Sequence, residues 1–144
     1  MLAAIDLGTN SARLLIGAVT GGRVFTVHRH RVVTKMGAGL KETGFLTPAA
    51  LARTRAALEE FRRLTAAHGV AAVRIVATSA ARRAVNAEEL VQEVRRIFGV
   101  DLRILDGREE AILSFQGAAS VLPADLKEKG PVVIDIGGGS TEIC

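Results

Sequence analysis

The chain has 144 residues, of which 49% are hydrophobic and 24% charged, and its formal net charge is +4. This length suits one domain with a buried core, and the composition excludes an intrinsically disordered chain. The basic residues are scattered, and their longest cluster, at residues 28–31, contains no Phe, Tyr or Trp for base stacking, which argues against nucleic-acid binding. A basic surface would still attract a polyanionic substrate.

The sequence contains no membrane-directed segment. No apolar run reaches the length of a membrane span, and the N-terminus reads as a strand without a basic leader or a cleavage site. The single cysteine, Cys144, cannot form a disulfide within the chain, so we assign it no redox role. We therefore expect a cytoplasmic protein without a membrane partner.

Residues 1–67 predict three strands and a helix. Two apolar runs, at 2–8 and 12–19, are joined by a tight turn, and a Gly-Gly pair at 21–22 leads into a third, antiparallel strand at 23–33. After a glycine-containing loop, Thr47 provides an N-cap and Pro48 the first helical position of a helix that extends to about residue 67.

Strands and helices alternate in the second half. We expect a strand at 73–77, a helix capped by Asn86 and Glu89, a strand at 102–105, and a helix at 107–121 capped by Asp106. Alternation implies right-handed crossovers and parallel strands. Together with the opening hairpins it predicts a ribonuclease-H-like mixed α/β sheet with flanking helices, the fold class of actin-like ATPase domains, over residues 1–122.

Residues 123–144 predict a connection and the beginning of another unit. Residues 123–130 form a polar linker, and an apolar strand at 131–136 follows it. In proteins of this architecture a second strand-hairpin unit begins at this point, so we expect 131–144 to be the first strand and phosphate loop of a second domain. Such a strand has an exposed edge, which could pair with a second copy of the chain and so form a homodimer.

Two glycine-rich loops resemble each other. Residues 6–13 read DLGTNSAR and residues 135–142 read DIGGGSTE, each beginning with an aspartate at the end of an apolar strand. Glycine permits positive φ and close backbone approach, which lets N–H groups converge on an anion. The repetition favours phosphate binding over two ordinary hairpin turns. The candidate phosphate-binding residues are Gly8, Thr9, Asn10, Ser11, Gly137, Gly138, Gly139, Ser140 and Thr141.

A pair of glutamates begins the last predicted helix. Glu109 falls at the third helical position and completes a capping box with Asp106, whereas the cap does not require Glu110. Glu110 shares a helix face with Ser114 and Gly117, small residues that leave room in front of its carboxylate. A glutamate beside a bound phosphate could take a proton from water, although spacing alone favours a complement to the helix dipole.

Residues 77–86 follow a buried strand and carry hydroxyl groups and arginines. In open α/β sheets, ligands gather beyond the carboxyl ends of such strands. Arg82 or Arg83 could make a bidentate contact with a phosphate, and either could equally be a solvated helix residue.

Taken together, these motifs resemble the exopolyphosphatase and guanosine pentaphosphate phosphatase family. The resemblance covers residues 4–11, 37–40, 77–86, 105–111 and 133–142 in chain order. It implies hydrolysis of a terminal phosphoanhydride in a cleft between two domains, with Mg²⁺ or another divalent cation. By this resemblance, Glu110 is the general base for the attacking water and Arg82 meets the substrate phosphate. The residues that it places near the metal are Asp6, Asp135 and Glu142.

The resemblance implies polyphosphate, guanosine pentaphosphate or both as substrate, and the sequence does not choose between them. Family enzymes need their second domain to close the cleft, so we expect these 144 residues alone to fold and to be nearly inactive. Two alternatives remain. An ATP-dependent small-molecule kinase has similar paired loops, but the Glu-Glu-Ala helix start disfavours it. A nucleotide-switched, actin-like interaction protein would not release phosphate from polyphosphate.

Overall fold

The computed structural model describes residues 1–144 and contains a five-stranded mixed sheet in the order β3-β2-β1-β4-β5. Strand β1 pairs antiparallel with β2 and parallel with β4; β2–β3 is antiparallel and β4–β5 parallel. This arrangement confirms the predicted mixed α/β sheet. The strands are β1 (Leu2–Leu7), β2 (Ser11–Thr20), β3 (Arg23–Val33), β4 (Ala72–Ala77) and β5 (Leu102–Ile104).

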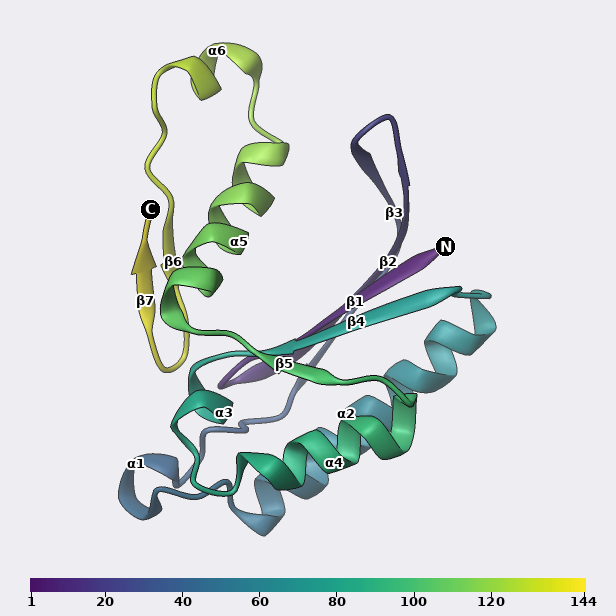
Figure 1. Ribbon diagram of the computed structural model, residues 1–144, viewed down its shortest axis with the longest axis vertical. Helices are drawn as coiled ribbons and strands as arrows, with labels where there is room; N and C mark the ends of the chain where they lie inside the picture. Colours follow the sequence, from purple (N-terminus) through teal and green to yellow (C-terminus); the bar gives the residue numbers. More distant parts are fainter.

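Helices α2 (Pro48–Ala67) and α4 (Ala87–Phe98) cover one face of this sheet (Figure 1). Alternate strand residues point toward them because side chains in a strand have a period of two. Ile5 and Leu14 are buried from the sheet side, and Phe61 is buried from α2. The opposite face of the sheet is mixed, with charged side chains beside apolar ones such as Ala4 and Leu15. Its charged residues Asp6, Arg13 and Arg31 reach the candidate site.

The residues predicted to cap helix N-termini do so in two helices but not in a third. Thr47 caps α2 by accepting the N–H of Ala50, and Asp106 forms the predicted capping box with Glu109. Asn86 precedes α4, but its side chain does not cap the helix. It exchanges hydrogen bonds with the backbone of Leu46 instead, accepting its N–H at 2.8 Å and donating to its carbonyl at 3.0 Å. A tertiary contact thus replaces the expected local one.

Three short helices were not predicted, because one turn is too brief to show a hydrophobic period. They are α1 (Leu40–Thr43), α3 (Ser79–Arg83) and α6 (Ala124–Glu128). No helix of the structure has both the length and the apolar character that a membrane crossing requires.

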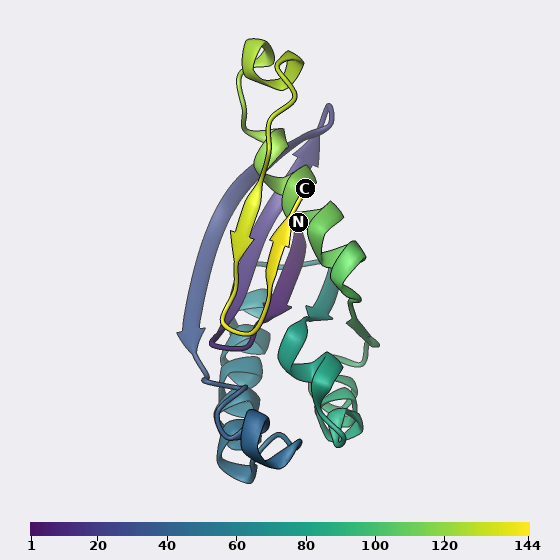
Figure 2. The same cartoon turned by 90° about the vertical axis from the view of Figure 1, so that its left-hand side faces the viewer.

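The last quarter of the chain, from residue 107 on, stands beside the five-stranded sheet. Helix α5 (Gly107–Ser120) packs against a two-stranded antiparallel hairpin, β6 (Ile134–Ile136) and β7 (Thr141–Ile143). Figure 2 shows this hairpin passing in front of the larger sheet. A separate sheet is consistent with a second domain at residues 131–144, although that boundary and the homodimer remain predictions.

Candidate functional site

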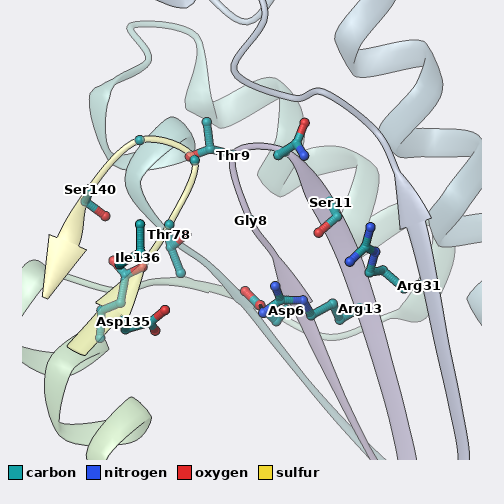
Figure 3. A pocket seen from close by; sticks show the side chains of 15 residues that line it. Asp6, Gly8, Thr9, Ser11, Arg13, Arg31, Thr78, Asp135, Ile136 and Ser140 are labelled. Carbon is teal, nitrogen blue, oxygen red and sulfur yellow. Dashed lines mark ion pairs between the residues drawn. The ribbon is translucent and has the colours of Figure 1, made fainter. Parts of the chain in front are cut away.

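The turn between β1 and β2 faces the turn between β6 and β7, and a pocket of about 330 Å³ lies between them (Figure 3). The pocket is lined almost entirely by polar groups and glycines. Residues from opposite ends of the chain thus form one site. All the predicted site residues line it except Arg82, Thr141 and Glu142.

Each of the two loops is closed by a backbone hydrogen bond at the same position of its motif. In the first loop the N–H of Gly8 donates to the carbonyl of Ser11 at 3.1 Å. In the second, the N–H of Gly137 donates to the carbonyl of Ser140 at 2.9 Å. The repeated sequence therefore gives a repeated turn, and each turn presents a hydroxyl-bearing loop to the pocket.

The glycines of these loops are needed for close approach, and the expected positive φ values are absent from them. A Cβ on Gly139 would lie 2.8 Å from Oγ1 of Thr9 and 2.9 Å from Oγ of Ser79. A Cβ on Gly138 would lie 3.2 Å from Cβ of Asn10. Both turns close without left-handed backbone, so these glycines matter because they leave room for the two loops to lie in contact.

Acidic side chains enter the site in two pairs. Burial raises the pKa of Asp6 at the end of β1; Arg13 opposes that rise, and the charge of the nearby Asp135 of β6 adds to it. Burial likewise raises the pKa of Glu110, and the charge of Glu142 acts in the same direction. Contacts from Arg82 and Thr78 partly offset that rise. Both carboxyl groups therefore hold their protons more tightly than free side chains do.

The donor chemistry of this site fits a hard divalent cation. Oδ1 of Asp6 and Oε2 of Glu142 are buried without a hydrogen-bond partner, which is costly for carboxylate oxygens unless a ligand satisfies them. No three His, Cys, Asp or Glu side chains lie close enough together to hold a metal ion by themselves. Mg²⁺ is usually bound by one or two carboxylates together with water and substrate phosphates. The two carboxylates of Asp6 and Asp135 therefore match the usual number of protein ligands.

Arg82 lies beside Glu110 outside the pocket lining. Its Nη1 donates to the carbonyl of Leu105 at 2.6 Å and to Oε2 of Glu110 at 3.1 Å. The side chain of Glu110 is 13% exposed, so this ion pair is largely shielded from solvent. Arg82 thereby fixes the carboxylate of Glu110, and its predicted contact with substrate phosphate remains a prediction.

Three polar residues of the pocket were not singled out from the sequence. Arg13 and Arg31 lie opposite each other on β2 and β3, and both line the pocket (Figure 3). Arg13 also lies 3.7 Å from Asp6. Thr78 lines the pocket and contacts Glu110. Arg31 belongs to the basic cluster at residues 28–31, to which we assigned no role in this site from the sequence.

Replacing the half-buried carboxyl group of Asp6 should stabilise this chain. The pKa of Asp6 is higher in the folded state than the ordinary 3.8, so its contribution to stability is present in acid and is lost as the pH rises through the folded value. Asp6→Asn should therefore raise the unfolding temperature at pH 7, by no more than about 2 °C because 38% of the side chain is exposed and solvent screens its charge. The gain should shrink as the pH approaches 3.8.

Differential scanning calorimetry at several pH values measures this difference. Asp101→Asn is a matched control, because Asp101 is 82% exposed and pairs with Arg95 on the surface, where ion pairs contribute little. An Asp6→Asn chain less stable than the wild type at pH 7 would show that the contact with Arg13 outweighs the cost of burial.

This chain is similar to known proteins over almost its whole length. The model of the Ppx/GppA phosphatase family matches residues 15–144. Exopolyphosphatase 2 of Mycobacterium tuberculosis is 42% identical over 153 residues, covering 99% of this chain and 47% of the relative. The chain therefore spans about half the length of this relative.

Solved structures agree as well. An exopolyphosphatase-like protein has a TM-score of 0.91 at 42% identity, and an exopolyphosphatase from Cytophaga hutchinsonii a TM-score of 0.88 at 31%. A Ppx/GppA family member from Aquifex aeolicus has a TM-score of 0.82 at 33%. Each match covers 99% of this chain and 43–45% of the other, which confirms the actin-like fold class as that of a first domain. The chain belongs to the Ppx/GppA phosphatase family.

Proposed function

We propose that the full-length protein hydrolyses the terminal phosphoanhydride of inorganic polyphosphate, and that guanosine pentaphosphate presents the same terminal group. The observation that carries the proposal is the pair of matching loops around a pocket lined by Glu110 and Asp135. The names of the relatives, which are exopolyphosphatases, support polyphosphate as the substrate class.

Phosphate binding would come from the loops and from two arginines. The hydroxyl groups of Thr9, Ser11 and Ser140 line the pocket and can donate to phosphate oxygens. Arg13 and Arg31 add positive charge on the sheet side. Phosphoryl transfer needs mainly positioning and charge neutralisation, and these groups supply both.

Glu110 would act as the general base. Its raised pKa makes it a stronger base than a free glutamate, yet the pairing with Arg82 keeps the carboxylate form accessible. The hydrogen bond to Arg82 and the contact with Thr78 hold the carboxylate at the pocket wall, where a water near the bound phosphate can lose its proton. Arg82 would in addition meet the substrate phosphate, as the family resemblance implies.

A divalent cation would be held by Asp6 and Asp135, with Glu142 close to the same group of carboxylates. When bound, the cation neutralises charge on the phosphate oxygens. Without it, the pocket would place carboxylates opposite a polyanion, which is unfavourable. The unpartnered oxygens of Asp6 and Glu142 support this assignment.

The test is a phosphate-release assay on the full-length protein with polyphosphate and guanosine pentaphosphate side by side. We expect Mg²⁺-dependent release from polyphosphate, and only trace activity from residues 1–144 alone. Release from ATP with transfer to a small molecule, and none from polyphosphate, would instead indicate a kinase. Full activity of the 144-residue chain would contradict the need for a second domain.

A further inference from the structure

Ser114 lies one helical turn after Glu110 and contacts the second loop's aspartate. Its Oγ donates a hydrogen bond to Oδ2 of Asp135 at 2.5 Å, in a part-buried position. This contact joins α5 to β6 across 21 residues of sequence. The sequence alone gave Ser114 no role beyond leaving room in front of Glu110.

The hairpin turns its carboxylates toward the interior and its apolar side chains outward. Asp135 and Glu142 lie directly opposite each other in the β6–β7 pair, so they share a face. Glu142 is buried and Asp135 is half-buried, whereas Ile134, Ile136 and Ile143 are exposed. The inner face of the hairpin, which α5 contacts, is therefore acidic.

Asp135 lacks the cationic partner that its neighbours have. Arg13 pairs with Asp6, and Arg82 pairs with Glu110, but Asp135 forms no ion pair. The charges of Asp6 and Glu142 repel it. A hydroxyl donor to a carboxylate at this distance is a strong, charge-assisted hydrogen bond, so Ser114 is the group that opposes the repulsion.

We propose that Ser114 is a positioning residue that holds Asp135 ready for a divalent cation. By binding Oδ2, the hydroxyl fixes the plane of the carboxylate and leaves Oδ1 available to the pocket that Asp135 lines. A hydrogen-bond partner of this kind orients a metal ligand and tunes its affinity. The inference rests on the proposed function, because it treats Asp135 as a cation ligand.

The experiment measures cation binding and catalysis separately in the full-length protein. Mn²⁺ affinity is measured without substrate by electron paramagnetic resonance of the free ion, and Mg²⁺ dependence by phosphate release from polyphosphate. Ser114→Ala removes the hydroxyl and Ser114→Thr retains it. Ser120→Ala is the matched control, because Ser120 is on the same helix and its Oγ binds only the carbonyl of Gly117.

We expect Ser114→Ala to weaken Mn²⁺ binding about tenfold, the lower end for loss of a group that orients a metal ligand. The Mg²⁺ concentration for half-maximal rate should rise by a similar factor, with kcat at saturating Mg²⁺ changed less. Ser114→Thr and Ser120→Ala should stay near the wild-type values.

An unchanged Mn²⁺ affinity in Ser114→Ala would overturn the proposal, even if the variant melted earlier, since the hydrogen bond would then only join α5 to β6. Failure of the wild type to bind Mn²⁺ would overturn it too. Weakened Mn²⁺ binding in a protein that releases no phosphate from polyphosphate would support the role of Ser114 and refute the proposed function instead.

Discussion

Glu110→Gln should abolish phosphate release from polyphosphate in the full-length protein while substrate binding persists. The amide keeps the size of the side chain and can still contact Arg82, but it cannot accept a proton from water. General-base catalysis contributes roughly a hundredfold to ten-thousandfold, so kcat should fall by about that factor. Steady-state phosphate release gives kcat, and calorimetric titration with polyphosphate gives the affinity.

The neighbouring glutamate supplies the control. Glu109 accepts a hydrogen bond from the N–H of Asp106 and pairs with Arg103 on the surface, so Glu109→Gln should leave kcat within about twofold.

The wild-type rate should fall when the medium becomes acidic enough to protonate Glu110. This fall should begin at a higher pH than for an ordinary glutamate, because burial raises the pKa of Glu110. Retained turnover in Glu110→Gln would remove Glu110 as the base.

Gly139→Ala should push the two phosphate loops apart. Its new methyl group would lie within 3 Å of the hydroxyls of Thr9 and Ser79, closer than van der Waals contact allows. Misplacing reacting groups by about 1 Å can cost roughly a hundredfold, so kcat/KM for polyphosphate should fall by up to about that factor.

Gly107→Ala is the comparison for this variant, because a Cβ at Gly107 meets nothing within 4 Å. It should leave kcat/KM near the wild-type value. Thermal unfolding of Gly139→Ala should change much less than its catalysis, since the loop lies outside the hydrophobic core. Wild-type kinetics in Gly139→Ala would show that the two loops can move apart without loss of catalysis, which would contradict this prediction.

The sheet and the main helices were predictable because their signals are local. The apolar runs of β1 and β2, the cap at Thr47 and the capping box at Asp106 each depend on residues within one turn or one strand. The phosphate loops were found because their repetition is visible in the sequence. The structure then showed that the repetition includes the same glycine-to-serine hydrogen bond.

What could not be predicted depends on long-range placement. Counting back from the Gly21-Gly22 turn would set His30 opposite Arg13, but a bulge between Ile16 and Gly17 shifts the register by one residue. Arg31 therefore faces the pocket instead. Such a bulge has no reliable local signature.

Side-chain partners distant in sequence are hidden for the same reason. Asn86 was assigned to the helix that it precedes, yet its partner is Leu46 across 40 residues. Ser114 and Asp135 likewise meet only when α5 packs on the hairpin.

The two loops belong to two sheets that differ in size and in how well their apolar side chains are buried. The first is anchored in five strands, whereas the second is held by strands of three residues whose isoleucines are exposed. Regions with few buried apolar contacts open at a free energy well below that of global unfolding. In this chain the pocket between the two loops can therefore be opened by a subglobal fluctuation of β6 and β7 while the five-stranded sheet stays intact, and a polyanion bound across both loops would suppress that fluctuation by linkage.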